Sequence, residues 1–345
     1  MAINASFFSS KELQIGIGLD ASNVGQVFSG TYTAIESDSV TMPTFNDIKI
    51  ERRGGAGSGI MTATTDMFHY GKGASIEGSV SGYLTDELVD ILFPNALGIA
   101  ESTNTYTVDG TSNTNTSFEH NATSALNKTV CFGYKRAGSE DDGLKIAGAV
   151  ITSLTITGDP NEDGGRMKFD LSYISRTPKA IASTFDTSPA TMGAYSSNYV
   201  FLTDYSNHCK IDNQDVLLKS FSMTIENPVV FGGFGGNATD GAPQTYIRSV
   251  PEMSITVNPV VKYDTNVDQL WEDLRGSGDG TQAETLTSPA FQMADHATYT
   301  DGDRAIRITD GTVTECSWDE VDYLGLSVTI KARGDSSVSF YLKHA

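Results

Sequence analysis

Residues 154–171 read LTITGDPNEDGGRMKFDL, in which two segments of alternating apolar and polar residues flank an acidic turn that contains glycine. Alternation with a period of two indicates β-strands that bury one face. A similar arrangement recurs 171–172 residues later, where Leu326 and Val328 precede a turn at 333–335 and an alternating segment at 338–342. The sequence therefore predicts that one strand–turn–strand unit occurs twice.

Two further elements recur in the same order in each half of the chain. An alternating segment that ends at 48–50 is matched by one at 221–225, and a glycine-rich loop follows each. A second alternating segment at 76–80 leads into a short apolar helix, as does its counterpart at 253–257. Two copies are too few for a solenoid, which stacks several shorter units. We therefore predict a mainly β chain with an internal duplication: two homologous β-sandwich or barrel-forming domains, each with a short flanking α-helix.

The length supports this division, because 345 residues suit two domains of roughly 150 residues each. We predict an N-terminal β domain at 1–180, which begins with a leading arm, a connection at 181–215 and a C-terminal β domain at 216–345. In the leading arm, Phe7 and Phe8 precede an alternating segment. This pattern predicts a strand or an extended arm that could pair with a neighbouring chain.

The first helix and the polar stretch after it carry local signals. Asp86 and Glu87 place acidic residues at the positive end of the helix dipole, and Pro94 is expected to end the helix. Residues 101–127, which are rich in Thr, Asn and Ser, predict an exposed loop or decoration that could hold a short hairpin.

Two long glycine-rich loops, 54–73 and 227–248, occupy equivalent places in the two halves. Exposed apolar residues in a long loop commonly mark a contact surface, although they can also fold back onto their own domain. We predict contacts with neighbouring subunits. The candidate residues are Gly54, Met61, Met67, Phe68, Tyr70, Phe231, Phe234 and Tyr246.

The composition limits the partners of the chain. A formal net charge of −20 disfavours tight binding to a phosphate backbone, because such binding depends on cationic side chains that displace counterions. The acidity suits solubility and repulsion between unassembled chains, and it is compatible with a surface that nucleic acid passes without sticking. Cys131, Cys209 and Cys316 lack CxxC spacing, so we expect reduced thiols rather than disulfides or a zinc site. Without a signal-peptide pattern or a long apolar segment, we expect neither export nor membrane insertion.

Catalytic signatures are missing from the sequence. It contains no G-x-S-x-G, Walker or H-E-x-x-H motif, so we expect no enzyme activity and no cofactor. Asp159, Asn161, Asp163 and Asp170 follow the oxygen-ligand spacing of a calcium loop and form a candidate cation site. Asp170 replaces the usual bidentate Glu, and strands replace the flanking helices. A polar hairpin turn is therefore the favoured interpretation, and no metal is predicted.

Two blocks of the sequence carry a recognisable pattern. Residues 145–158, KIAGAVITSLTITG, with a glycine pair at 164–165 and an alternating strand after them, resemble the closing motif of the tail tube proteins of long-tailed bacteriophages. The second block begins with SMTIEN at 222–227, continues after a glycine-rich loop through 251–257, and ends with DQLW at 268–271. The blocks lie in both halves and touch nearly all of the predicted secondary structure.

The resemblance implies a β-sandwich with a flanking helix, whose sheets join around a ring into a continuous barrel that carries DNA. Most members of the family place one such domain in each of six subunits. Because this chain has two, we expect a trimeric, pseudo-hexameric ring and a role as the major tail tube subunit. The implied partners are further copies of the chain, a tape-measure protein, tail-tip and tail-terminator proteins, and double-stranded DNA in transit without specific binding. The implied location is the virion tail, with host cytoplasm during assembly.

A half-polar sheet that continues into its neighbour leaves no open edge, which agrees with this architecture. On two of the predicted strands, small hydroxyl side chains lie opposite the apolar ones. We predict that this weakly acidic face lines the channel, where it would repel phosphates without trapping them. The candidate residues are Ser75, Glu77, Ser79, Ser81, Ser220, Ser222 and Thr224. The main alternative is a two-domain β-sandwich binding module, such as a capsid decoration, adhesin or lectin. A β-rich hydrolase is disfavoured by the missing catalytic groups.

Overall fold

The structure of the chain is a computed structural model. It describes residues 12–19, 28, 30–38, 40–46, 49–51, 68–70, 75–97, 102–108, 111–119, 129–136, 143–175, 191–204, 208–231, 246–248, 254–265, 267, 271–272, 286–287, 289–294, 305–320, 324–333 and 338–341.

The described chain is mainly β, as predicted. The first elements are β1 (Leu13–Leu19), β2 (Thr31–Ile35), β3 (Thr44–Asn46), β4 (Lys49–Glu51), β5 (Phe68–Tyr70), β6 (Ser75–Tyr83), α1 (Asp86–Leu97), β7 (Ser102–Val108), β8 (Thr111–Glu119), β9 (Val130–Arg136), β10 (Gly143–Gly158) and β11 (Lys168–Ser175). They are followed by β12 (Thr191–Met192), β13 (Lys210–Ile211), β14 (Gln214–Asp215), β15 (Leu218–Glu226), β16 (Val229–Phe231), β17 (Tyr246–Arg248), β18 (Ser254–Lys262), β19 (Phe291–Ala294), β20 (Ala305–Ile308), β21 (Gly311–Asp319), β22 (Gly325–Ala332) and β23 (Val338–Tyr341).

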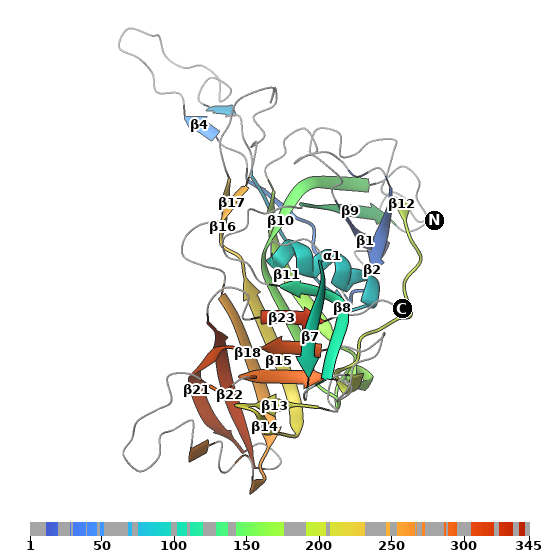
Figure 1. The fold of residues 1–345 in the computed structure, drawn as a ribbon. Coiled ribbons are helices and arrows are strands. Elements are labelled where there is room, and N and C mark those ends of the chain that lie inside the picture. Colours follow the sequence, from blue (N-terminus) through green and yellow to red (C-terminus); the bar gives the residue numbers. More distant parts are fainter. Residues whose placement is uncertain are drawn as a thin grey trace, which may run out of the picture.

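One antiparallel sheet runs through both halves of the chain (Figure 1). Its strands follow the order β3-β6-β11-β10-β15-β18-β22-β21, with four strands from each half, and we call it the central sheet. The halves meet where β10 pairs with β15. The first part of β10 pairs instead with β9, and β9 is followed by β1, β2 and β12 in the outer layer of the first half. A second sheet has the order β14-β13-β19-β20-β23-β8-β7.

The four-strand units of the two halves correspond in order and in backbone contacts. β3-β6-β11-β10 matches β15-β18-β22-β21, and helical residues follow β6 in one unit and β18 in the other. Beyond β6, the Leu84 amide donates to the Met167 carbonyl at 2.9 Å. Beyond β18, the Tyr263 amide donates to the Leu324 carbonyl at 3.2 Å. Tyr263 is thus the counterpart of Leu84, and Leu324 is the counterpart of Met167.

A β-bulge lies at the corresponding place in each unit. The register between β10 and β11 shifts at Thr152, and the register between β21 and β22 shifts at Thr314. At both shifts the threonine hydroxyl donates to a carbonyl of the facing strand, from Thr152 to Ser172 at 3.1 Å and from Thr314 to Thr329 at 3.3 Å. The hairpin β21–β22 is therefore the counterpart of β10–β11.

This register corrects the strand match expected from the sequence. The segments at 326–328 and 338–342 were expected to form one hairpin, but β22 pairs with β18 and β21, whereas β23 pairs with β20 and β8. Alternation identifies a strand and its buried face without specifying its partner. The stretch 101–127 contains the hairpin β7–β8, and β8 joins the second sheet through β23. Its described strands are therefore part of a sheet and not a separate decoration.

Helix α1 packs against β10 and continues through Pro94, so the prediction that Pro94 ends the helix is wrong. Proline removes one backbone hydrogen bond from a helix interior. The last turn is nevertheless anchored, because Asn95 is fully buried and its Oδ1 accepts a hydrogen bond from the Ile151 amide at 2.9 Å. Within the described part of the chain, no helix is long and apolar enough to cross a membrane.

Among the described residues, one large hydrophobic core runs through both halves, and Tyr32, Cys131 and Ala147 form a separate small cluster. In the first half, Phe132 stacks on Tyr173 with ring centres 4.2 Å apart, and the Tyr173 hydroxyl lies 3.0 Å from that of Tyr134. In the second half, Phe291 stacks on Phe221 at 5.7 Å. Because both the core and the central sheet are continuous, the proposed boundaries of the two domains stay a prediction.

Candidate functional site: the polar face and the sheet edges

The central sheet has one apolar face and one polar face. On β11 the side chains of Phe169, Leu171 and Tyr173 are buried, whereas those of Asp170 and Ser172 are exposed. β15 continues this alternation in the second half, where residues 221, 223 and 225 are buried. The polar face therefore extends across the junction between the halves.

Rows of polar side chains cross the strands of this face. Ser81, Asp170, Thr155 and Thr224 are direct neighbours on β6, β11, β10 and β15. The hydroxyls of Thr155 and Thr224 lie 3.1 Å apart, so they form a hydrogen bond across the junction of the two halves. This row is lined mainly by hydroxyl groups.

Six of the seven channel candidates share this polar face. Glu77, Ser79 and Ser81 are exposed on β6, and the candidates on β15 are half-buried. Ser75 starts β6 opposite Asn46, and its side chain lies outside the described ones. The shared face is a property of the fold, and the role of these residues stays a prediction.

Other polar residues of this face did not enter the sequence-based set. Thr155 and Thr157 alternate with Leu154 and Ile156 in the stretch quoted first, so the signal was present. Its counterpart in β21 and β22 could be found only after the register was known. The additional residues on the polar face are Ser153, Thr155, Thr157, Ser317, Ser327 and Thr329.

The turn between β10 and β11 borders one end of the polar face. Lys168 forms an ion pair with Asp163, and this hydrogen bond lowers the pKa of Asp163 and raises the pKa of Lys168. The Arg166 guanidinium lies 3.8 Å from the centre of the Tyr83 ring, and one of its nitrogens lies 3.8 Å from a carboxylate oxygen of Glu36. These contacts hold the turn against the end of β6.

The cation candidates lie in and after the same turn. Asp159 Oδ1 accepts a hydrogen bond from the Asn161 amide at 2.8 Å, and Asp163 is paired with Lys168. Asp170 lies on β11 opposite Thr155. Among the residues that the structure describes, no group of three or more His, Cys, Asp and Glu side chains is arranged to hold a metal ion.

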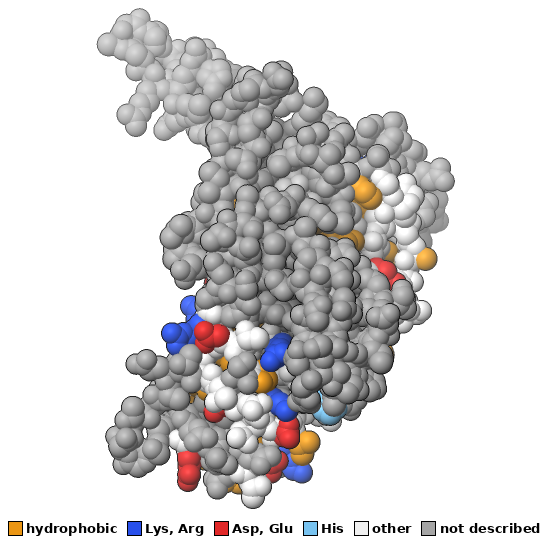
Figure 2. All heavy atoms as spheres, in the orientation of Figure 1, with side chains coloured by type: hydrophobic (Ala, Val, Ile, Leu, Met, Phe, Trp, Pro, Cys, Tyr) orange, Lys and Arg blue, Asp and Glu red, His pale blue; other side chains and the backbone are white. Residues whose placement is uncertain are grey.

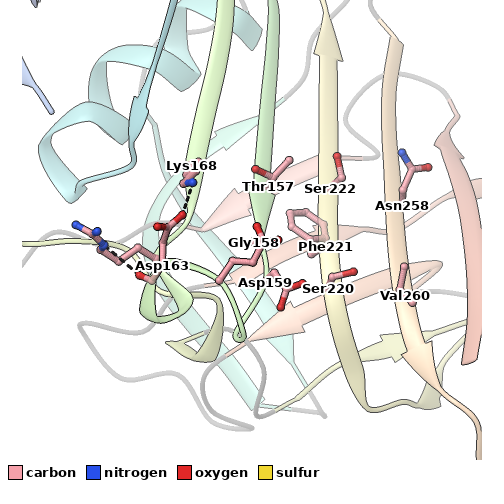
Figure 3. Close-up of a pocket in the computed structure, with 12 residues that line it drawn as sticks. Thr157, Gly158, Asp159, Asp163, Lys168, Ser220, Phe221, Ser222, Asn258 and Val260 are labelled. Atoms are coloured by element: carbon pink, nitrogen blue, oxygen red, sulfur yellow. Dashed lines mark hydrogen bonds and ion pairs between the residues drawn. The ribbon is translucent and has the colours of Figure 1, made fainter. Parts of the chain in front are cut away.

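A hollow of about 320 Å³ lies beside this turn (Figure 3). Thr157, Ser222 and Asn258 form one row across β10, β15 and β18 at its wall, and the pair of Asp163 and Lys168 lies to one side. None of its lining residues is a histidine or a cysteine. The hollow therefore presents hydroxyl, amide and carboxylate groups and the cationic groups of Arg166 and Lys168, without a thiol or imidazole.

The two ends of the central sheet are open edges within the described part of the chain. β3 pairs with β6 alone, and β21 pairs with β22 alone. Two exposed apolar side chains lie at these edges: Met42, just before β3, is 41% exposed, and Trp318 in β21 is 37% exposed. An open strand edge is a template for pairing with another chain.

Charge is mixed on the surface that can be seen. Figure 2 shows described acidic and basic side chains interspersed over the lower part of this view, where the second half lies. In the second half, an ion pair joins Lys219 Nζ to Asp319 Oδ2 at 2.8 Å. This face offers no continuous basic patch among the described residues.

Of the loop candidates, four lie in short hairpins. Tyr70 pairs with Lys49 and Phe68 with Glu51 in β4–β5, and Phe231 pairs with Tyr246 in β16–β17. Both hairpins lie toward the same end of the molecule, at the upper left of Figure 1. The other candidates lie outside the described residues: Gly54, Met61, Met67 and Phe234.

Comparison with known proteins assigns the chain to a family. The family model for the phage tail tube protein matches residues 70–340, which is most of the chain. No curated protein matches the chain. Members of this family are structural and have no enzymatic role, and the family implies a place in the virion tail. The chain, with its polar-faced sheet running through both halves, belongs to the phage tail tube protein family.

Proposed function

We propose that this chain is the major tail tube subunit, and that three copies close into a pseudo-hexameric ring that stacks into the tube. The observation that carries this proposal is the central sheet, which joins two corresponding four-strand units and, among the described strands, ends in two open edges. A sheet of this kind reaches full pairing when copies join end to end and close. Two corresponding units in each of three chains give six around the ring.

The junction between β10 and β15 serves as the template for the contact between chains. There Thr155 lies opposite Thr224, and the Asn227 amide donates to the Thr152 carbonyl at 2.8 Å. β21 corresponds to β10, and β3 corresponds to β15. Transfer of the internal register to these edges places Ser317 of one copy opposite Thr44 of the next.

The polar face would then line the channel. Its side chains are mostly hydroxyls, with Glu77 and Asp170 among the exposed acids. The described cations on this face, Lys168, Lys262 and Lys331, lie among these hydroxyls and acids, and Lys168 is paired with Asp163. The net charge of −20 disfavours the counterion release on which phosphate binding depends. Double-stranded DNA would therefore pass without specific binding. The duplication, with domains at 1–180 and 216–345 joined by 181–215, is supported by the matched bulges and the matched bonds at Leu84 and Tyr263.

The hairpins β4–β5 and β16–β17 would lead the long loops toward the next ring. They follow β3 and β15, which are corresponding strands, and both lie at one end of the molecule (Figure 1). We further propose that the tube forms around a tape-measure protein in the host cytoplasm, and that it ends at tail-tip and tail-terminator proteins. Ring stacking through a heterologous face produces an open filament, as a tail requires.

Disulfide trapping tests the ring. In the double variant Thr44→Cys with Ser317→Cys, we expect disulfides between chains, with the ladder on a non-reducing gel ending at a closed trimer. The internal pair Thr155→Cys with Thr224→Cys is the matched positive control, because it should close within one chain. Thr44→Cys with Thr329→Cys, one strand further in, is the negative control.

Each outcome of this experiment bears on the proposal. A ladder that ends at six chains would replace the trimer by a hexamer. Assembled tubes that cross-link equally well in the negative control would refute the register. Particles that remain single chains under negative-stain microscopy would favour a binding module over a tube subunit.

A further inference from the structure

An apolar patch is exposed at one corner of the second half. Leu217 is 56% exposed, Leu324 is 47% exposed and Trp318 is 37% exposed. Trp318 packs against Trp271 with ring centres 4.4 Å apart and against Tyr263 at 5.6 Å, and the rings are tilted in both pairs. We call these five residues the corner patch. Exposed apolar groups of this kind commonly mark a contact surface.

The same corner of the first half is covered. Leu84 and Met167 are the counterparts of Tyr263 and Leu324, and the hairpin register makes Ile156 the counterpart of Trp318. Leu84 is only 2% exposed, and Met167 and Ile156 are each 1% exposed. The two corners therefore share a backbone arrangement and differ in what lies over them.

The cover in the first half is the segment 198–202. The Met167 amide donates to the Val200 carbonyl at 2.8 Å, and the Val200 amide donates to the Leu84 carbonyl at 3.0 Å. Val200 and Leu202 are buried, with exposures of 0% and 1%. A Cβ atom built on Gly158 would lie 3.1 Å from Leu202 Cβ, so Leu202 seals the end of β10.

The segment that covers the first half leads directly into the second half. Soon after Leu202 the chain enters β13, where Ile211 pairs with Phe291. In the first half, Ile17 of β1 pairs with Phe132 in the corresponding way. Ile17 and Ile211 are thus counterparts, and the residues before β1 correspond to those before β13.

The sequence before β1 repeats the cover segment at this same spacing. Counting back from Ile17 and Ile211 without a gap places Asn4 at Asn198, Phe7 at Phe201 and Phe8 at Leu202. Of the two buried positions of the cover segment, that of Leu202 is therefore occupied by the aromatic Phe8 in the leading arm, and that of Val200 is occupied by Ser6. Its counterpart surface, the corner patch, is itself richer in aromatic residues than the covered corner.

We propose that residues 4–8 of a neighbouring copy bind the corner patch, with Phe8 packed beside Trp318 and Leu324. The inference rests on the proposed ring, in which the unit that follows the second half is the first half of the next copy. The corner of the first half is covered by residues 198–202, which lead into the second half. The corner patch would likewise be covered by residues 4–8, which lead into the first half of the next copy. The arm thus links adjacent subunits of one ring, in addition to the pairing of β21 with β3.

Cysteine pairs in the full chain test the arm directly. Glu320 corresponds to Gly158, and Phe8 corresponds to Leu202. In the variant Phe8→Cys with Glu320→Cys, we expect a disulfide between chains in assembled rings. Gly158→Cys with Leu202→Cys is the matched control and should close within one chain. The single variants Phe8→Cys and Glu320→Cys show whether native thiols interfere.

The outcomes separate the arm from the ring. If the unmodified protein forms no rings, the proposed function fails. If rings form and the Phe8→Cys, Glu320→Cys pair stays unlinked, or closes within one chain, arm exchange between copies is refuted. Linkage of Phe8→Cys to a native cysteine instead would place the arm elsewhere and refute the corner patch as its site.

Fluorescence gives a second measurement that needs no disulfide. The chain has two tryptophans, Trp271 and Trp318, and both lie in the corner patch. In the assembled oligomer, Phe8→Asp should leave the indole side chains of Trp271 and Trp318 more accessible to acrylamide than they are in the unmodified protein. Phe7→Asp is the control, because its counterpart Phe201 is only half-buried and the change should be smaller. Equal quenching in both variants and the unmodified protein would overturn the proposal.

Discussion

The hairpins β10–β11 and β21–β22 share a register and a bulge, yet only the first has neighbours on both sides within the described chain. β10 lies between β11 and β15, whereas β21 pairs with β22 alone. At one matched position the enclosed hairpin carries Ile156, which is buried, and the open one carries Trp318, which is 37% exposed. The comparison teaches that two hairpins with the same register can differ in burial: the enclosed one carries an aliphatic core residue where the one at the open edge carries an exposed aromatic residue.

The largest effects should come from alanine substitutions at this matched position, which we expect to lower subunit stability in one hairpin and tube formation in the other. Ile156→Ala removes a buried side chain and should lower the free energy of unfolding by about 2–5 kcal/mol. Trp318→Ala should cost the separate subunit only about 0.5–1.5 kcal/mol, mainly the packing against Trp271. It should instead raise the critical concentration for tube formation by about tenfold or more, because a central aromatic residue is lost from an interface.

Chemical denaturation of unassembled protein and sedimentation of tubes measure the two effects. Leu324→Ala provides a second variant in the open hairpin. Equal losses of subunit stability for Ile156→Ala and Trp318→Ala would break the comparison, since it assigns one position to the core and the other to assembly.

The next largest effect should be a difference in stability between the two halves at high pH. Burial raises the pKa of Tyr134 to about 12, and burial together with the neighbouring Tyr134 raises the pKa of Tyr173 well above its ordinary value. A folded-state pKa above the unfolded value means that the stabilising contribution is intact below about pH 10 and is lost as pH rises toward about 12. The counterparts in the second half, Met293 and Ile330, do not titrate.

We therefore expect alkaline unfolding to begin in the first half. Hydrogen exchange followed by mass spectrometry should show β9 losing protection before β19. Tyr134→Phe with Tyr173→Phe should remove this difference. Burial also raises the pKa of Cys209 to about 12, so Cys209→Ala is the necessary control. Simultaneous loss of protection in both strands at every pH would contradict the prediction.

The bulges offer a smaller and symmetrical test. Thr152→Val and Thr314→Val each remove one hydroxyl-to-carbonyl hydrogen bond, so each should cost about 0.5–1.5 kcal/mol in the unassembled subunit. The two losses should agree within about 0.5 kcal/mol, because the bonds have the same geometry. Thermal unfolding of the two variants side by side checks this. A much larger loss at one site would weaken the correspondence between the hairpins.

The smallest effect on stability should come from the polar face. Glu77→Lys changes an exposed strand residue and should alter the free energy of unfolding by no more than about 0.5 kcal/mol. In the proposed channel, it would replace a repulsive charge by an attractive one in every subunit. DNA ejection should slow, most at low salt, because attraction to phosphate is linked to counterions.

Thr256→Lys is the matched change in the second half, since the strand register makes Thr256 the counterpart of Glu77. Ejection rates from mutant virions across ionic strengths, with normal tail morphology as the control, give the measurement. Unchanged rates at every salt concentration for both variants would reverse the assignment of the channel face.

Sequence alternation predicted the parts of this fold that depend on local burial. The strands around Leu154, Phe169 and Met223 follow from it, as do the helix after β6 and the polar face with Glu77. Predicting these features requires only the period of the apolar residues and, for the helix, the acidic residues at its start. The order of elements along each half was also visible.

Sequence alone did not give the partners of the strands. β23 alternates as expected, but it joins β20 and β8 rather than β22, because alternation fixes a buried face and leaves the neighbour open. Pro94 led to a wrong prediction of the helix end for a similar reason. The burial of Asn95 and its hydrogen bond to the Ile151 amide hold the last turn, and neither can be read from the local sequence. The corner patch was invisible for the same reason: Leu217, Tyr263 and Trp318 are distant in sequence and come together only through the register.

The pairing of the two halves within one chain, at β10–β15, has a consequence for how quickly tubes can start. In the proposed ring of three chains, half of the six sheet junctions exist before any two molecules meet. Tethering two units replaces a bimolecular encounter by a high effective concentration, which lowers the kinetic order of nucleation from six bodies to three. The remaining junctions all have the same pair of edges, so the concentration below which rings no longer close should be set by one repeated junction, that of β21 with β3 together with the proposed arm.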